Sequence, residues 1–388
     1  MHEPALLRLL EGFPVRVSTA EGAGRRLVAA RDLAAGELVL ASLPFGRVAY
    51  PVAAKHWCAI CNGLSPASPL RLSCPGGCGL FFCSRACLAA AVHHGGDWCA
   101  LRRALRERNS RPQLPPPPPP PLPPPLPPPP LCEEAATLAL LLVDILSRAA
   151  CPPAVAEGVC VEPGAPLALP PRLDDLFELY TPDADHLAAH GLGEWTSTWR
   201  DVAVETAAAA AVAAPGLALP SLEVMAAIAS KDLSNSFGLW DRTHACREVK
   251  HRGGGHALFL SAALLNHSCV PSLYHTHHRV GTAAVMVLRA LRPLKEGEEL
   301  SIRYVDPRGG DFERRKVFTD TWGFSCACAR CEGDETERSA AAEAWDGAFL
   351  CGCGYGRPGG GPGIGAKPLK RAHCVCPVPW ILPQATAA

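Results

Sequence analysis

The chain has 388 residues, and its 37 lysine and arginine residues balance 37 aspartate and glutamate residues. This formal net charge of zero argues against a protein that binds nucleic acid or a membrane surface through bulk positive charge. The length allows two or three domains at roughly 150 residues each, and the hydrophobic fraction of 48% is enough for a packed core.

The cysteine content needs an explanation, because the chain has 19 cysteines and only 3 methionines. Disulfides belong to oxidising compartments, but the N-terminus carries Glu3 and lacks the long apolar run of a secretory signal. No run of about 18 uninterrupted apolar residues predicts a membrane-spanning helix. Metal ligation by thiolates in a reducing compartment is the competing interpretation, and the spacing of the cysteines must decide.

Taken in chain order, the first predicted elements are strands. Residues 15–50 alternate in a strand-like way between turn residues, which is typical of a small antiparallel sheet. Residues 58–99 are dense in cysteine, glycine and histidine and too polar for an ordinary core. Residues 112–130 are almost continuous proline, which favours polyproline II and predicts an exposed spacer, with a ligand of SH3 or WW domains as the alternative.

The second half begins with a helical segment and returns to strands. Apolar residues at helical spacing predict a helix over residues 133–149, and helices are also predicted over 201–214 and 221–228. Strand patterns follow within residues 256–305, and residues 332–388 form a tail that becomes rich in glycine and proline.

Residues 58–99 contain four close pairs of potential metal ligands. Each short pair presents two ligands to one ion, so seven cysteines and one histidine suffice for two tetrahedral zinc sites. Buried free cysteines would not produce evenly staged pairs, and this spacing favours metal. His93 could replace the neighbouring histidine, and the sequence leaves that choice open. The predicted ligands are Cys58, Cys61, Cys74, Cys78, Cys83, Cys87, His94 and Cys99.

Two further cysteine clusters lie toward the C-terminus. Cys326, Cys328 and Cys331 are one ligand short of a tetrahedral site, and Cys269 is the strongest candidate for the fourth. The tail holds four more cysteines around a Gly-rich loop, which predict a zinc ribbon, with a disordered tail as the alternative. These are Cys351, Cys353, Cys374 and Cys376, and Cys132, Cys151, Cys160 and Cys246 remain as ordinary buried or linker residues.

Residues 264–272, Leu-Leu-Asn-His-Ser-Cys-Val-Pro-Ser, resemble the NHSCxPN signature of SET-domain protein-lysine methyltransferases. The order of the motifs resembles the SMYD family, in which a MYND zinc module is inserted in a split SET domain. Residues 22–24 resemble the family's glycine motif, and residues 235–237 resemble a motif that precedes the NHSC segment. Residues 297–304 with 324–331 resemble the end of SET and the post-SET cysteines.

The resemblance implies an α+β fold, in which a split SET-domain β fold carries an inserted MYND zinc module, a helical insert and a Cys-rich post-SET segment. It divides the chain into the N-terminal part of SET (1–57), the MYND module (58–99), a basic helix with the Pro-rich linker (100–131), the helical insert (132–255), the C-terminal part of SET (256–306), the post-SET zinc segment (307–331) and the Gly/Cys-rich tail (332–388).

The resemblance also implies transfer of a methyl group from S-adenosylmethionine to the ε-amine of a protein lysine. The catalytic residue would be Tyr304, whose hydroxyl would orient the amine and the methyl group rather than act as a general base. Each matched residue alone has an ordinary structural explanation, and only the ordered set indicates a site. The cofactor-binding residues that it implies are Gly22, Ala23, Gly24, Asn235, Asn266, His267, Tyr304 and Phe324.

Two positions depart from the family pattern. Ser272 replaces the final asparagine of the signature and offers fewer hydrogen-bond donors for the segment crossing that the family has there. Trp322 stands where close relatives often carry tyrosine, and it would narrow the lysine channel. The tail after Cys331 is too short for the helical C-terminal domain of some members, so peptide recognition would rest on the SET surface and this tail.

The implied function is a protein-lysine N-methyltransferase for a histone or non-histone protein, with S-adenosylmethionine and zinc as cofactors. The alternative is a non-catalytic SET/MYND scaffold that binds proline-rich peptides through MYND. DNA binding through a basic helix is a third hypothesis, but a solvated helix face explains the positive charge of that helix equally well. Specific nucleic acid and membrane partners are not expected. Reduced thiols predict the cytoplasm, the nucleus or both. The basic helix behind the third hypothesis contains Arg102, Arg103, Arg106, Arg108 and Arg111.

Overall fold

The computed structural model describes most of the chain up to residue 336. The predicted proline spacer, Cys246 and the four tail cysteines lie outside the described residues, so those predictions stay predictions. None of the described helices combines the length and the hydropathy of a membrane span. The described residues are 5–20, 24–63, 65, 68–109, 131–151, 158–240, 253–304, 315–316, 318–319, 322–334 and 336.

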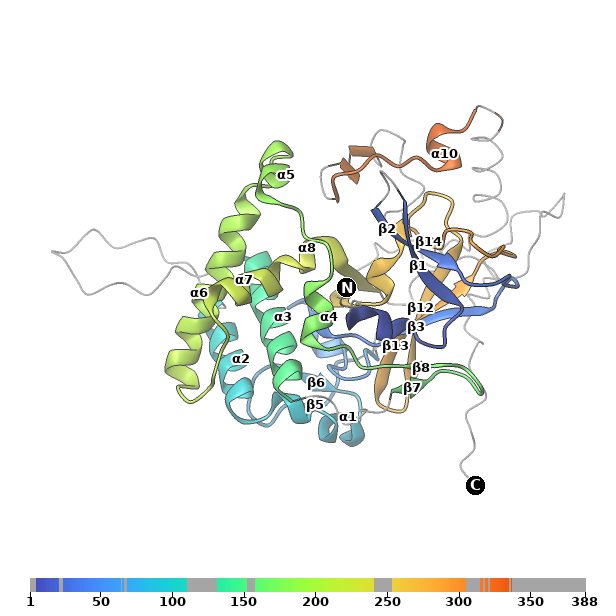
Figure 1. Cartoon of the computed structure of the whole chain (residues 1–388). Coiled ribbons are helices and arrows are strands. Elements are labelled where there is room, and N and C mark those ends of the chain that lie inside the picture. The colour runs from blue at the N-terminus through green and yellow to red at the C-terminus, as the bar shows by residue number, and fades with distance from the viewer. Residues whose placement is uncertain are drawn as a thin grey trace, which may run out of the picture.

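The strands gather on one side of the molecule and the long helices on the other (Figure 1), which confirms the predicted α+β class. Strands from the first 50 residues pair with strands that follow residue 235, so both parts of the chain build one β domain. In this domain β13 lies between β12 and β3, β10 lies between β4 and β9, and β11 pairs in parallel with β14. Its strands are β1 (Val15–Ala20), β2 (Gly24–Ala29), β3 (Leu38–Ser42), β4 (Gly46–Ala49), β9 (Ser236–Trp240), β10 (Gly253–Leu258), β11 (Asn266–His267), β12 (Leu273–Val280), β13 (Ala283–Ala290) and β14 (Ser301–Ile302).

The predicted helices are present, with one start moved. The helix predicted from residue 201 begins at Glu194, and the hydroxyl of Ser221 accepts a hydrogen bond from the Val224 amide where the next helix begins. The helices are α1 (Arg85–Ala89), α2 (Gly96–Asn109), α3 (Glu133–Ala150), α4 (Leu173–Phe177), α5 (Ala184–Ala189), α6 (Glu194–Ala213), α7 (Leu222–Ser230), α8 (Asp232–Asn235) and α10 (Ala329–Glu332), with 3₁₀ turns η1 (Ala5–Leu10), η2 (Ala54–His56), η3 (Val92–His94) and η4 (Ala262–Leu264).

The cysteine-rich segment between β4 and α2 forms a separate small unit, which we call the zinc module (residues 58–99). Two short hairpins are not hydrogen-bonded into the sheets of the main β domain. One belongs to the zinc module, β5 (Leu72–Ser73) with β6 (Phe81–Phe82), and the other follows α3, β7 (Val159–Cys160) with β8 (Leu167–Ala168). The buried residues of the zinc module are mostly cysteines, with Ile60 and Phe82 among the few large apolar side chains. A core this small needs a metal or a disulfide to be stable.

Helix α3 joins the zinc module to the β domain. It buries the predicted apolar face and packs so closely on β4 that a Cβ at Gly46 would overlap the side chain of Ile145. On the same helix, the buried Asp144 pairs with Arg148 at 2.7 Å and accepts a hydrogen bond from the Arg47 amide at 3.0 Å. Burial alone would raise the pKa of this carboxyl, but Arg148 and the neighbouring His93 and Arg47 hold the pKa well below its ordinary value.

Candidate active site and zinc centres

The zinc module brings its eight predicted ligands together as two groups of four. The first and third pairs along the chain form one group and the second and fourth pairs form the other, so the two centres interleave. Within each group the ligand atoms lie within 4.8 Å of one another. The groups are Cys58, Cys61, Cys83 and Cys87, and Cys74, Cys78, His94 and Cys99.

The structure decides between the two neighbouring histidines. His94 Nε2 lies 3.0 Å from the sulfur of Cys74 and 3.6 Å from that of Cys78. His93 points the other way, and its Nε2 lies 3.7 Å from the carboxylate of Asp144. His94 therefore lies in the second group of four, and whether it binds a metal stays a prediction, whereas His93 connects the zinc module to α3.

The spacing of the sulfurs fits zinc. Sulfurs about 2.3 Å from a tetrahedral ion lie about 3.8 Å from one another. The observed distances are 3.5 Å between Cys61 and Cys83 and 3.5 Å between Cys74 and Cys99. The described cysteines are free thiols at separations far beyond a disulfide bond of about 2.05 Å. Cysteine and histidine at these distances are a zinc donor set, which agrees with the predicted metal.

A third group forms where residues 326–331 pack against the β domain. Cys269 lies 4.0 Å from Cys326 and 3.6 Å from Cys331, sulfur to sulfur, and Cys328 completes the group. Cys269 thus lies where the predicted fourth ligand is needed, and its binding of a metal stays a prediction. Three of the four sulfurs are buried, which is typical of a structural site rather than of reactive thiols.

Aromatic side chains surround this third group. The ring of His267 lies 5.4 Å from that of Tyr304 and 4.2 Å from that of Phe318, and Phe318 stacks on Phe324 at 5.4 Å. Trp322 closes the cluster at 5.1 Å from Tyr304. Sequence reasoning missed Phe318, which is fully buried, because it lies outside every recognised motif.

The hydroxyl of Tyr304 is held in place by the backbone. It donates a hydrogen bond of 2.6 Å to the carbonyl of Leu265, and the Tyr304 amide donates to Nδ1 of His267 at 2.9 Å. Burial raises the pKa of Tyr304 well above its ordinary value, and the charge of Glu299 adds to this effect. The phenol therefore keeps its proton at neutral pH and can orient a neighbouring group, but it is no general base.

A family model of the SET domain matches residues 24–305, nearly three quarters of the chain. The chain belongs to the SET domain family.

Two curated relatives of this SET protein confirm the resemblance to the SMYD family. The histone-lysine N-methyltransferase SMYD3 of Mus musculus is 35% identical over 30% of this chain and 25% of its own length. A SET and MYND domain-containing protein of Dictyostelium discoideum is 30% identical over 32% of this chain and 29% of its own length. The alignments thus span less than a third of the length of these relatives. Among solved structures, the SET domain of LSMT bound to lysine and AdoHcy aligns over 89% of this chain and 64% of that chain, with 12% identity and a TM-score of 0.35.

The SET signature segment forms hydrogen bonds with two other parts of the domain. Nδ2 of Asn266 donates to the carboxylate of Glu299 at 3.0 Å and approaches the carbonyl of Arg25 at 3.5 Å. Gly24, beside that carbonyl, has a φ of +66° and open space where a Cβ would lie. Glu299 was not predicted as a site residue, although its place in the GEEL segment was a signal that could have found it.

Of the remaining predicted cofactor residues, some have described contacts and others lie outside the described residues. Nδ2 of Asn235 donates to the carbonyls of Tyr180 and Lys231, both at 2.8 Å, which orients its amide at the end of α8. Trp322 donates to the carbonyl of Ser234 at 3.1 Å, so this end of α8 lies beside the aromatic cluster. Gly22 and Ala23 lie outside the described residues, and their role stays a prediction.

Ser272, the departure at the end of the signature, has partners that suit its short side chain. Its hydroxyl accepts a hydrogen bond of 2.7 Å from the Ser301 amide and donates to the Glu299 carbonyl at 3.2 Å. In return, the Ser272 amide donates to the hydroxyl of Ser301 at 3.2 Å. The reciprocal serine pair joins the signature segment to β14, so serine serves as the support that the family's asparagine gives at this position.

We expect Ser272→Ala to destabilise the chain by about 1–3 kcal/mol, because the buried Ser301 amide would lose its acceptor. Urea denaturation followed by far-UV circular dichroism measures this difference. Ser197→Ala on the exposed face of α6 is the matched control and should change the free energy of unfolding by less than about 0.5 kcal/mol. Equal stability of the two variants would contradict the supporting role of Ser272.

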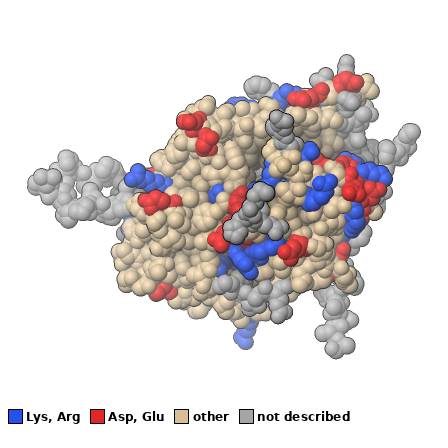
Figure 2. Space-filling view, viewed as in Figure 1, with Lys and Arg blue, Asp and Glu red and all other residues tan. Residues whose placement is uncertain are grey.

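The basic helix does not present a solvated basic face. Arg102 is buried against α3, where it donates to the Leu140 carbonyl at 3.0 Å, and Arg108 pairs with Glu205 of α6. Only Arg103 is exposed among the described arginines of α2, and Arg111 lies outside the described residues. On the face shown in Figure 2, basic side chains lie among acidic ones rather than in one continuous patch. The interpretation of this helix as a solvated face is wrong for Arg102, while Arg106 and Arg108 are half-buried.

Proposed function

We propose that the protein is a protein-lysine N-methyltransferase that transfers a methyl group from S-adenosylmethionine to a lysine of a histone or non-histone protein. The observation that carries the proposal is the contact of Tyr304 with His267 of the signature segment, within a SET domain. The name of the mouse relative, a histone-lysine N-methyltransferase, supports it. Because the matched part is a minor share of that relative, the activity of this chain needs its own test.

In this proposal one edge of the aromatic cluster holds the cofactor. S-adenosylmethionine supplies an activated methyl group on a positively charged sulfur. The open space beside Gly24 allows the backbone at the start of β2 to approach it, and the oriented amides of Asn235 and Asn266 can offer their oxygens as acceptors. His267 and Phe324 give the apolar contact surface on which a planar group stacks.

The same cluster supplies the environment that the lysine amine needs. A free lysine has a pKa of about 10.4 and must lose its proton before it can accept a methyl group. Walls made of Trp322, Phe318 and Tyr304 favour the neutral amine, because burial disfavours the charged form. The fixed hydroxyl of Tyr304 lies where it can orient the amine for in-line attack.

A direct assay tests the proposal. The full chain, loaded with zinc, is incubated with methyl-labelled cofactor and an array of proteins and peptides that includes histone tails. We expect label on specific lysines, and we expect none when the array carries arginine at the same positions. Absence of transfer to any lysine by a zinc-loaded chain that binds the cofactor would contradict the proposal.

The alternative is a scaffold without activity that binds proline-rich peptides through the zinc module. What supports such a partner is the aromatic pair Trp57 and Phe81, because polyproline II segments dock on aromatic surfaces. Calorimetry with S-adenosylmethionine separates the two functions, since a scaffold with a decayed site would not bind the cofactor. Specific nucleic acid binding is not proposed, because Arg102 is buried and Arg108 is paired with Glu205, which leaves few arginines of α2 for such a surface.

We further infer that the protein works in the cytoplasm, the nucleus or both. Support comes from the three clusters of free thiols, which need a reducing compartment to remain metal ligands. A fluorescent fusion of the full chain, imaged together with nuclear and cytoplasmic markers, tests this inference.

A further inference from the structure

A cavity of about 450 Å³ lies between the zinc module and the rest of the protein. Its walls come mainly from the strand β4, the zinc module, α2 and α3. It lies apart from the aromatic cluster around Tyr304 and shares no lining residue with it. A volume of several hundred cubic ångströms suits a small ligand or part of a peptide.

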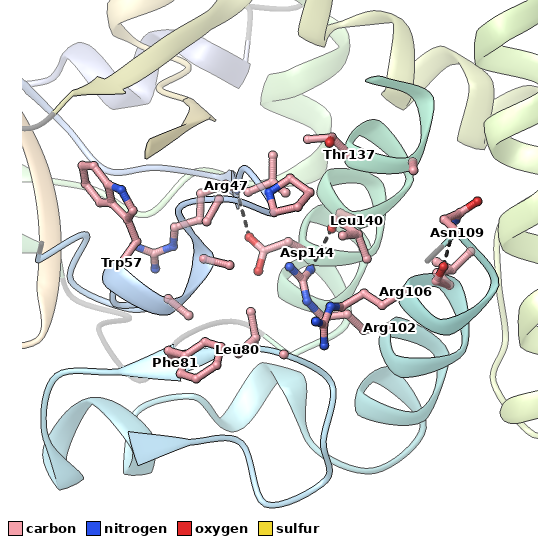
Figure 3. Close-up of a pocket in the computed structure, with 18 of the residues that line it drawn as sticks. Arg47, Trp57, Leu80, Phe81, Arg102, Arg106, Asn109, Thr137, Leu140 and Asp144 are labelled. Carbon is pink, nitrogen blue, oxygen red and sulfur yellow. Dashed lines mark hydrogen bonds between the residues drawn. The ribbon is translucent and has the colours of Figure 1, made fainter. Parts of the chain in front are cut away.

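The two ends of the cavity differ in chemistry. Figure 3 shows Trp57 and Phe81 toward one side and the guanidinium groups of Arg102 and Arg106 toward the other. The aromatic end also holds the buried guanidinium of Arg47, which donates to the Ile60 carbonyl and to Oδ1 of Asn62. The arginine end carries the charges of Arg102 and Arg106, which lie one helical turn apart on α2. A ligand that fills the cavity would therefore meet an apolar wall and a basic wall.

Arg102 is fixed but incompletely paired. Its side chain is only 6% exposed, and Nη1 donates a hydrogen bond to the Leu140 carbonyl at 3.0 Å. Its Nε is buried and has no hydrogen-bond partner among the described residues. A buried donor without an acceptor is costly, so a ligand that supplies an acceptor would be stabilised here.

Arg106 has still fewer partners. It forms no hydrogen bond or ion pair with any residue that the structure describes. Its guanidinium lies directly over Gly79, where a Cβ would overlap it, so this glycine makes room for the arginine. Two acids, Asp144 and Glu133, also line the cavity. The oxygens of Asp144 make their described contacts with Arg148, His93 and the Arg47 amide, and neither acid forms a described ion pair with Arg102 or Arg106.

We propose that the arginine end of this cavity binds the anionic group, a carboxylate or a phosphate, of an organic ligand whose apolar part lies against Trp57 and Phe81. Two guanidinium groups on one helix face match the oxygens of such an anion in a forked arrangement. A proline-rich peptide has no charge to offer them, so it does not explain this end of the cavity. The proposal is independent of methyl transfer.

Calorimetry with the zinc-loaded full chain tests the proposal. The probes are N-acetylphenylalanine, its uncharged amide and inorganic phosphate. We expect saturable binding of the carboxylate at about 1 mM or below, at least about tenfold tighter than binding of the amide. Inorganic phosphate should compete with the carboxylate, because both need the same two arginines.

Matched variants assign the binding to the arginine pair. Arg106→Gln should weaken carboxylate binding about tenfold, and Arg106→Lys should weaken it less, because lysine keeps the charge and loses the fork. Arg106 forms no hydrogen bond or ion pair with a described residue, so we expect the substitution to leave the fold intact. Arg103→Gln, which removes an exposed charge from the same helix, should leave the affinity unchanged.

Two results would overturn the proposal. Equal binding of the carboxylate and the amide would show that the cavity is only an apolar site. Unchanged carboxylate affinity in Arg106→Gln, together with faster loss of zinc to a chelator, would show that Arg106 serves as a counter-charge for the thiolates of the zinc module.

Discussion

Replacing Tyr304 by phenylalanine should lower kcat for methyl transfer by about a hundredfold, the usual cost of removing one fixed hydrogen-bonding group from an active site. The change removes a hydroxyl that the Leu265 carbonyl holds at 2.6 Å and leaves the ring in its contacts with His267 and Trp322. We therefore expect the affinity for S-adenosylmethionine to stay within about twofold, because apolar contacts and amides account for most of that binding. Steady-state kinetics with a lysine peptide and calorimetry with the cofactor measure the two effects.

The pH profile distinguishes orientation from base catalysis in the same variant. Since burial raises the pKa of Tyr304, the phenol stays protonated over the working range, and its removal should not move the midpoint of the rate profile. Tyr274→Phe is the matched control, because this buried tyrosine of β12 has a hydroxyl without a described partner and lies outside the aromatic cluster. If Tyr304→Phe kept more than half of the wild-type kcat, the orienting role would be wrong.

The sequence singled out the eight residues that form the two groups of the zinc module, but it could not predict which pairs share a group. Spacing indicates which cysteines form close pairs, because neighbours along a short loop must lie near one another. Whether the first pair joins the second or the third depends on how the hairpin of β5 and β6 folds back, which is a tertiary property. The same limit applied to His93 and His94, since only the position of Asp144 on α3 shows which one faces the metal cluster.

Polar residues at buried or half-buried positions misled the sequence analysis in two places. Strand β12 carries His275 and His277 on one face, and their rings pack against Phe237 and Phe259. A period-2 pattern of hydrophobicity does not register histidine as a core residue, so this strand was not singled out. Arg102 was interpreted as part of a solvated face because arginine is rarely buried without partners.

Glu299 shows what a motif can and cannot reveal about a site. The family resemblance marked its segment as the end of SET, and composition alone gave no reason to connect it with Asn266, which lies 33 residues earlier. The connection arises because β11 and β14 pair in parallel and place the two side chains next to each other. The domain boundaries in the helical insert remain predictions, since the described contacts do not divide it.

The second large effect concerns the third metal centre. Residues 322–334 have almost no apolar core of their own, and their buried side chains gather around Cys269, Phe318, Cys326 and Cys331. In such small segments metal binding supplies most of the folding free energy, of the order of 10 kcal/mol. Cys269→Ala should therefore release one zinc ion per chain, and it should lower methyl transfer more than about a hundredfold because Trp322 and Phe324 would lose their places beside Tyr304.

Elemental analysis of zinc and the transfer assay check both parts of this expectation. Cys151→Ala, which removes an exposed thiol outside all three described clusters, should keep both the zinc content and the rate. The zinc module and the main core should stay folded in Cys269→Ala, because neither shares a ligand with the third centre. A variant that keeps its zinc content would show that Cys269 is not a ligand.

Alkylation separates a structural role of the thiols from a chemical one. In the zinc-loaded chain, iodoacetamide should modify the exposed Cys132, Cys151 and Cys160 and leave the transfer rate nearly unchanged, because metal-bound thiolates react slowly. After zinc is removed with a chelator, the same treatment should abolish the activity irreversibly. If alkylation abolished the activity while elemental analysis still found the full zinc content, a cysteine would take part in the chemistry. The buried position of the third cluster argues against such a role.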